Sequence, residues 1–167
     1  MSYQAQYERW LHSPALSQPE KDELAALSHN AGEIEDRFFS LLQFGTAGLR
    51  GVMGVGLRRM NVHVIRHATQ AFANVILAEG KAFAAQGVAI CYDCRVHSQE
   101  FARAAAEVMA GNGIPVRLFE AMRPTPELSF AVREYSCAAG LNVTASHNPP
   151  EYNGYKVYWS DGAQLPP

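Results

Sequence analysis

The sequence predicts an α/β domain with a mostly parallel sheet that helices cover on both faces, preceded by a short helical region. The first observation is an alternation of short apolar segments of strand length with longer segments whose apolar residues recur at helical spacing. The second is composition. The chain has 167 residues, 48% of them apolar and 18% charged, which is typical of one packed domain. Consecutive parallel strands are joined by helices that lie over the faces of the sheet. The alternation therefore favours a sheet whose strands are buried on both faces.

Residues 1–40 are expected to form a helical extension, and residues 41–167 the main domain. Ser17 and Glu20 have the spacing of a capping box, in which the two residues satisfy each other's free amides at the start of a helix. A further helix is expected over residues 33–39, where apolar residues again recur at helical spacing.

The main domain is expected to begin with an irregular segment and to continue as alternating helices and strands. Residues 44–56 hold five glycines in thirteen positions, which favours a loop or an irregular strand. Asn61 can cap the long helix that follows, and Thr125 before a proline can cap a later one. The expected elements are a helix over 61–87, a strand over 88–92, a helix over 98–111, a strand over 114–119, a helix over 125–135, and strands over 137–143 and 155–159.

Charge, cysteine count and hydropathy argue against several classes of protein. The formal net charge of −2 gives no reason to expect nucleic acid or an anionic membrane as a partner. The first residues lack the basic and apolar regions of a signal peptide, and no apolar run approaches the ~18 residues that suggest a membrane span. Three cysteines give an odd count without a disulfide framework. We therefore expect a cytoplasmic protein.

The segment GLNVTASHNPPEYNGYK, residues 140–156, gathers polar side chains where an apolar strand ends. Two prolines follow Asn148 and restrict the backbone, so that Ser146 would be presented at one angle. Asn153-Gly154 is a strong hairpin-turn signal and predicts that the chain folds back there, which would return Lys156 towards the serine. From these residues alone, a reactive serine and a purely structural polar turn are equally good interpretations.

A second polar segment is FGTAGLRG, residues 44–51. Glycine at every third position lets backbone amides approach a ligand, and Arg50 offers a guanidinium fork that suits phosphate. Glycine-rich turns are common, so a structural turn is the alternative. Loops at 93–97, 122–125 and 144–150 follow predicted strands and can converge at the edge of the sheet where ligands bind in such folds.

Taken together, these motifs resemble the α-D-phosphohexomutases. TASHNP at 144–149, the FGTAGLRG loop, DxR at 93–95, PTP at 124–126 and NGYKVYW at 153–159 all fit the family pattern. TAGLRG and NGYKVYW are most similar to the phosphoglucomutase/phosphopentomutase branch. The resemblance implies the N-terminal domain of the family, a three-layer α/β/α unit with a mostly parallel, mixed sheet that carries a phosphoserine loop.

The resemblance also assigns roles to single residues. Ser146 would be phosphorylated in the resting enzyme and would pass its phosphoryl group to a sugar monophosphate. The resulting bisphosphate would turn round and return its other phosphate to the serine. Lys156 is implied to assist proton transfer and Arg50 to stabilise the phosphoryl group, with His147 beside the serine as the fourth catalytic residue. The implied phosphate-binding residues are Thr46, Gly48, Arg50, Asn148 and Lys156.

Mg²⁺ and a sugar bisphosphate activator are the cofactors that the resemblance implies, with Ser146 ligating the metal through its phosphate. The family takes its other metal ligands from three aspartates of a D-x-D-x-D loop. The aspartates of this chain are scattered, at Asp22, Asp36, Asp93 and Asp161. We therefore expect the phosphoserine domain of a longer enzyme, with the remaining domains of the same polypeptide as its partners, and expect the isolated chain to be inactive.

The function expected from the resemblance is that of a phosphoglucomutase-like isomerase, which interconverts sugar 1-phosphate and sugar 6-phosphate. Two alternatives stay open. One is a phosphomannomutase or phosphopentomutase, because the loops that choose the sugar are missing from the sequence. The other is a sugar-phosphate-binding module without turnover.

Some polar residues have structural interpretations that are as good or better. Asp93 and Arg95 fit a family motif, but a structural ion pair explains them equally well. His63 and His67 have a possible metal-ligand spacing on the long helix, although a solvated helix face is the better explanation. The pair Arg58-Arg59 before Asn61 is expected to be exposed.

Overall fold

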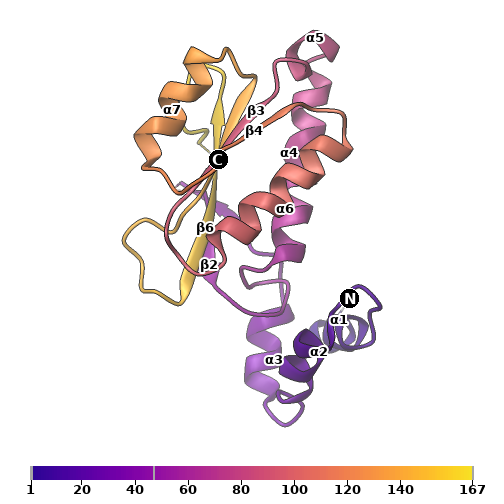
Figure 1. Cartoon of the computed structure of the whole chain (residues 1–167). Helices are drawn as coiled ribbons and strands as arrows, with labels where there is room; N and C mark the ends of the chain where they lie inside the picture. Colours follow the sequence, from indigo (N-terminus) through magenta and orange to yellow (C-terminus); the bar gives the residue numbers. More distant parts are fainter. Residues whose placement is uncertain (1, 47, 167) are drawn as a thin grey trace.

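The main domain is built on one six-stranded sheet in the computed structural model, which describes residues 2–46 and 48–166 (Figure 1). Across the sheet, the strands are β1 (Phe44–Gly45), β2 (Gly48–Val52), β6 (Tyr152–Trp159), β5 (Ala139–Val143), β3 (Val88–Tyr92) and β4 (Val116–Leu118). Strand β3 pairs in parallel with β4 and β5, whereas the pairs β5–β6, β6–β2 and β2–β1 are antiparallel. Strands β2, β3, β4 and β5 therefore run in the same direction, and the predicted mostly parallel, mixed sheet is confirmed.

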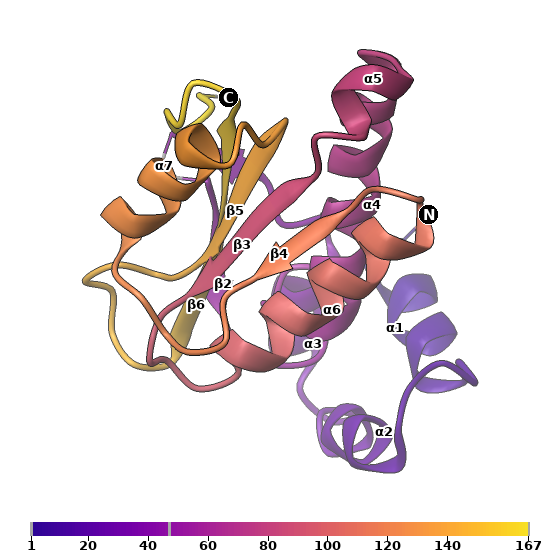
Figure 2. The same cartoon turned by 45° about the horizontal axis from the view of Figure 1, so that its top comes forward.

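Helices cover both faces of this sheet and produce three layers (Figures 1 and 2). Helices α4 (Val62–Ala78) and α6 (Ser98–Gly111) lie on one face, and α7 (Thr125–Glu134) lies on the other. Asn61 caps α4 as predicted, because its side chain accepts a hydrogen bond from the Val64 N–H. The helical segment predicted as far as residue 87 is divided, since the four-residue α5 (Lys81–Ala84) follows α4 as a separate element. The α/β/α architecture that the resemblance implies is confirmed.

Each face of the sheet has its own apolar core. Leu141 and Tyr155 belong to the cluster beneath α4 and α6, whereas Cys91 and Tyr158 belong to the cluster beneath α7. Successive residues of a strand point to opposite faces, so Lys156, between Tyr155 and Val157, lies on the α7 side of the sheet.

The N-terminal region forms three helices, α1 (Tyr3–Leu11), α2 (Gln18–Ala25) and α3 (Ala31–Phe38), beside the main domain (Figure 1). Their small apolar core includes Tyr7, Leu24 and Phe38, and Val55 of the main domain packs into it. The predicted capping box is present, because the Glu20 carboxylate accepts hydrogen bonds from the Ser17 N–H at 2.8 Å and from its hydroxyl at 2.7 Å. Within the described ranges, no helix is both long and apolar enough to cross a membrane.

Arg59 joins this helical region to the main domain, so the expectation that it is exposed is wrong. Its side chain is only 11% exposed and donates to Glu33 Oε1 at 3.0 Å and to Asp36 Oδ2 at 2.7 Å. Two carboxylates from α3 neutralise the guanidinium, which allows a charged side chain to be buried here.

The predicted turn at Asn153-Gly154 is wrong as well. Both residues lie inside β6 and are buried, and the chain reverses before β6, over residues 144–151. A Cβ atom on Gly154 would lie 2.5 Å from the Thr144 carbonyl oxygen, so the glycine allows β5 and β6 to approach closely. The Asn-Gly pair therefore serves packing in the interior of the sheet.

The start of α7 differs from the prediction by one residue. Pro124 is the N-cap, and Thr125 is already helical. The Thr125 hydroxyl accepts a hydrogen bond from Asn142 Nδ2 at 2.8 Å, so this side chain connects α7 to β5 and does not cap the helix.

Candidate active site

Ser146 lies on a tight turn directly after the carboxyl end of β5. Its φ angle is +58°, in the left-handed region that residues other than glycine rarely adopt. The Ser146 N–H donates to Thr144 Oγ1 at 3.0 Å, and the Asn148 N–H donates to the Ala145 carbonyl at 3.1 Å. Thr144 and Ala145 are buried, whereas Ser146 is exposed. The turn therefore presents the serine side chain to solvent from a backbone that buried residues and hydrogen bonds hold in place.

His147 is the side chain beside the serine hydroxyl. Its Nδ1 atom lies 3.4 Å from Ser146 Oγ, and both side chains are exposed. This distance is long for a hydrogen bond from a hydroxyl, so the ring does not strongly activate the serine in this conformation. It does place a ring nitrogen within reach of any group that Ser146 carries.

Lys156 comes from β6, the strand next to β5, and Arg50 comes from β2, the strand on the other side of β6. In the β2–β6 register Arg50 lies opposite Gly154, whose carbonyl accepts the Thr144 N–H at 3.0 Å. Lys156 lies opposite Asn142 of β5. The sheet thus brings Arg50, which is distant in sequence, to the same edge as the serine turn.

The surroundings of Lys156 make its ammonium group a stronger acid than that of a free lysine. Burial lowers the pKa of Lys156 below its usual value of 10.5, the positive charge of Arg50 lowers it further, and Asp93 acts in the opposite direction. Among residues 2–46 and 48–166, neither Lys156 nor Arg50 forms an ion pair. Two neighbouring cations without carboxylate partners make this edge of the sheet attractive to an anion.

Gly48 allows β2 to lie close to Lys156. Its φ angle is +90°, and a Cβ atom there would lie 2.5 Å from the Tyr155 carbonyl oxygen and 3.1 Å from Lys156 Cα. A larger residue would be strained in its own backbone and would push β2 away from β6. The predicted role of Gly48 in phosphate binding is therefore accompanied by a role in packing.

Thr46 and Asn148 are the other predicted phosphate-binding residues. Thr46 is exposed, and its carbonyl accepts a 3.4 Å hydrogen bond from Gln164 Nε2. Its neighbour Ala47, in the glycine-rich segment, lies outside the described residues. The Oδ1 atom of Asn148 is buried, and no donor in the described part of the chain reaches it.

Arg95, for which the sequence left two interpretations open, lies against the serine loop. Its ion pair with Asp93 is long, with 3.7 Å between Nε and Oδ2. Its short contacts are instead four hydrogen bonds to backbone carbonyls: those of Pro149 at 2.8 Å, Tyr152 at 3.0 Å, Ser146 at 3.0 Å and Asn148 at 2.5 Å. The DxR motif was the only sequence signal for this residue, because backbone partners leave no pattern of their own.

The described residues do not form a metal site by themselves. Among residues 2–46 and 48–166, no three His, Cys, Asp or Glu side chains are grouped so that they could hold a metal ion. His63 is not on a solvated face as expected, because its Nε2 atom lies 2.8 Å from Glu20 Oε1 and its ring packs edge-on against Trp10. His63 therefore belongs to the contact with the N-terminal helices, whereas His67 is exposed as expected.

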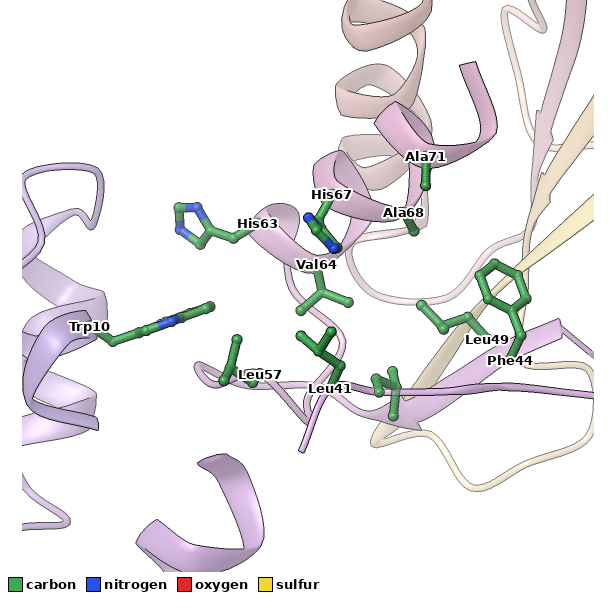
Figure 3. Close-up of a pocket in the computed structure, with 11 residues that line it drawn as sticks. Trp10, Leu41, Phe44, Leu49, Leu57, His63, Val64, His67, Ala68 and Ala71 are labelled. Atoms are coloured by element: carbon green, nitrogen blue, oxygen red, sulfur yellow. The ribbon is translucent and has the colours of Figure 1, made fainter. Parts of the chain in front are cut away.

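An apolar pocket of about 370 Å³ lies away from the serine turn, between α1, α4 and β2 (Figure 3). Trp10, Leu57 and Val64 line it together with Leu49, which neighbours Arg50 on β2 but points to the opposite face of the sheet. None of its described lining residues is a serine or a carboxylate, so this pocket is not the candidate active site.

Comparisons with known proteins give the same family as the motifs. The family described as phosphoglucomutase/phosphomannomutase, alpha/beta/alpha domain I, matches residues 41–167. A phosphopentomutase of Mus musculus is 40% identical over 167 residues, which are 96% of this chain and 27% of the relative. A phosphoglucomutase of Staphylococcus aureus (strain USA300) is 47% identical over 135 residues, which are 80% of this chain and 24% of the relative.

Two solved structures share the fold. A protein from Thermus thermophilus is 36% identical with a TM-score of 0.67, and the match covers 75% of this chain and 27% of that one. A phosphoglucomutase/phosphomannomutase family protein from Burkholderia thailandensis is 28% identical with a TM-score of 0.60, covering 73% and 27%. The chain thus spans about a quarter of the length of these relatives. It belongs to the phosphoglucomutase/phosphomannomutase family, within the α-D-phosphohexomutases, and contains the α/β/α domain I of that family.

Proposed function

We propose that this chain is the phosphoserine-bearing domain of a phosphoglucomutase-type isomerase, which interconverts sugar 1-phosphate and sugar 6-phosphate through a bisphosphate. The observation that supports it best is the presentation of Ser146, exposed on a left-handed turn, with Arg50 and Lys156 at the same edge of the sheet. Phosphoryl transfer depends mainly on positioning and on stabilisation of charge. This arrangement offers both.

In the proposed reaction, the bond between phosphorus and Ser146 Oγ breaks while a hydroxyl oxygen of a sugar monophosphate bonds to the phosphorus. Arg50 offsets the negative charge of the phosphoryl oxygens. The departing Oγ takes a proton, which we assign to the Lys156 ammonium, since its lowered pKa eases proton release. The proton of the sugar hydroxyl leaves to solvent, and His147 orients Oγ. The bisphosphate then turns round and returns its other phosphate to Ser146 by the reverse steps.

Mg²⁺ and a sugar bisphosphate activator belong to this proposal. The residues of this chain do not fit a complete Mg²⁺ site, because a Ser146 phosphate would supply one oxygen and the described ranges supply no carboxylate cluster. We therefore assign only that oxygen to the chain. The other ligands, and the groups that bind the second phosphate of a bisphosphate, would come from outside the described residues.

A phosphopentose is the second candidate substrate. The match to the Mus musculus phosphopentomutase covers 96% of this chain, whereas the match to the Staphylococcus aureus phosphoglucomutase covers 80%. The wider match supports a test of ribose 1-phosphate beside glucose 1-phosphate and mannose 1-phosphate in the same assay. Specific binding without turnover of any of the three, in the complete protein, would favour a binding module.

The division of the chain is also proposed. We assign residues 1–40 to a helical extension and residues 41–167 to domain I of a longer polypeptide, whose other domains would be its partners. The family match over 41–167 supports this division, as does the apolar core of α1, α2 and α3, which is distinct from the two cores of the sheet although Val55 packs into it. The three cysteines are all free, which supports a reducing compartment such as the cytoplasm.

Mass spectrometry of the complete protein, purified from cells, tests the proposed function. We expect one phosphate on the peptide that contains Ser146 and no turnover of sugar phosphates by Ser146→Ala. Ser160→Ala removes an exposed serine just after β6 and is the matched control, with wild-type turnover expected. Phosphate found only on other peptides, or wild-type turnover by Ser146→Ala, would refute the assignment.

A further inference from the structure

The guanidinium of Arg95 occupies a ring of backbone carbonyls contributed by the serine loop. Its two Nη atoms carry four N–H groups, and the structure provides one carbonyl acceptor for each of them, two on Nη1 and two on Nη2. The remaining N–H, on Nε, faces Asp93 Oδ2 at 3.7 Å. The four Nη donors therefore each have a carbonyl acceptor, whereas the Nε–H faces the Asp93 carboxylate at ion-pair distance only.

This arrangement leaves Arg95 no free Nη donor for a phosphate on Ser146. An arginine beside a phosphoserine would ordinarily be expected to bind the phosphate through its planar fork. Here the fork is turned to the carbonyl side of the loop, where it offsets the repulsion between four oxygens that point at one place. The Arg95 side chain is only 13% exposed, so water does not easily replace it.

A polar network anchors Arg95 to the rest of the domain. Asp93 Oδ1 accepts hydrogen bonds from the Arg95 N–H at 3.0 Å and from the hydroxyl of Ser98 at 2.7 Å. Ser98 is the first residue of α6, and its hydroxyl in turn accepts from Asn153 Nδ2 of β6 at 3.0 Å. The serine loop is thus connected through Arg95 to α6 and β6, which are parts of the packed core.

We propose that Arg95 is a positioning residue that holds the Ser146 loop in its left-handed conformation, and that it does so through its shape as well as its charge. The expected effect of Arg95 on turnover rests on the proposed function, whereas its expected effect on the loop conformation does not. Lysine keeps the charge but has three donors on one atom and cannot span four carbonyls. A free guanidinium ion has both the charge and the shape.

The test compares Arg95→Ala and Arg95→Lys with Arg103→Ala, which removes an exposed arginine of α6, in the complete protein. Hydrogen exchange of the amides of residues 145–148 and 151–152, and turnover of glucose 1-phosphate, are the two measurements. In both Arg95 variants we expect loop exchange roughly ten- to a hundred-fold faster, as for the loss of one charge-assisted hydrogen bond, with lower kcat. Arg103→Ala should match the wild type. Added guanidinium should slow loop exchange and restore turnover in Arg95→Ala, whereas ammonium at the same concentration should not.

Wild-type loop exchange in Arg95→Ala would overturn the inference. So would reduced turnover with unchanged exchange, because Arg95 would then act on the phosphate or substrate directly. If Arg95→Ala does not fold, the decision passes to Arg95→Lys, in which wild-type exchange and turnover would show that charge alone suffices. If Ser146 is not the phosphoryl carrier, the exchange effect persists while Ser146→Ala retains turnover, which separates failure of the proposed function from failure of this inference.

Discussion

Gly154→Ala is a sharp test of how closely the strands beneath the serine turn are packed. Gly154 lies inside β6, between β5 and β2. A Cβ atom there would lie 2.5 Å from the carbonyl oxygen of Thr144 and 3.0 Å from that of Leu49. Both obstacles are backbone atoms of neighbouring strands, so neither can move aside as the end of a flexible side chain can. The added methyl group must therefore separate strands or break hydrogen bonds.

The expected cost follows from this geometry. Overpacking of a well-packed interior typically costs about 1–3 kcal/mol, and a clash against two backbone atoms places this variant at the upper end. For a chain of this size, each kcal/mol lowers the melting temperature by about 2–4 °C, so we expect a fall of about 4–12 °C. The Thr144 N–H, which donates to the Gly154 carbonyl at 3.0 Å, should also exchange faster.

Thermal unfolding of the 167-residue chain, followed by circular dichroism, measures the effect. Gly111→Ala is the matched control, because Gly111 ends α6 and a Cβ atom there would meet nothing within 4 Å. Alanine also has the higher helix propensity, so the control should melt at the wild-type temperature or above it. If Gly154→Ala melts with the control, the close approach of β5 and β6 and the reasoning built on it are wrong.

Two further predictions concern charge. A lowered pKa means that the Lys156 ammonium loses its proton at a lower pH than a free lysine, so turnover that needs the ammonium should fall as pH rises through that lowered value. Arg50→Gln removes one cause of the lowering and should shift this alkaline limb of the kcat/KM profile to higher pH, and an unchanged limb would count against proton donation by Lys156. Arg59→Met should lose hydrogen bonds to two carboxylates of α3, at a cost of about 1–3 kcal/mol, and should speed proteolysis within residues 2–40. Unchanged proteolysis would show that Arg59 does not hold the N-terminal helices in place.

Local patterns were enough to predict most elements of the fold. The capping box at Ser17, the Asn61 cap and the apolar segments around β3 and β5 each depend on residues that are near one another in sequence. Asn153-Gly154 could not be interpreted in this way. The pair has the composition of a hairpin turn, but Asn153 is buried and its Nδ2 atom donates to Ser98 Oγ, a contact that sequence proximity does not reveal. Tertiary contacts overrode the local turn preference.

The same distinction between local patterns and tertiary contacts applies to the candidate site. Ser146, Arg50 and Lys156 were predicted from motifs, and the structure places them at one edge of the sheet, although their roles remain proposals. The contribution of Arg95 could not be predicted, because its partners are carbonyl oxygens, which every residue possesses. Which carbonyls converge is decided by the path of the loop. Similarly, the burial of Arg59 could not be predicted. Its two carboxylate partners lie on α3, more than twenty residues earlier in the chain, and nothing near Arg59 in the sequence points to them.

The arrangement around Lys156 also suggests how a phosphoryl carrier on Ser146 would control a proton. Burial and Arg50 lower the pKa of Lys156 when the serine is free. A phosphate on Ser146 brings negative charge to the same edge of the sheet, and a nearby anion favours the ammonium form. On the proposed function, Lys156 therefore holds its proton while the phosphate is on the enzyme and releases it more readily as the phosphate departs. That is the moment at which Oγ needs a proton. Because backbone carbonyls occupy all four Nη donors of Arg95, its fork would not compete for the phosphate, and the coupling would run through Lys156 and Arg50.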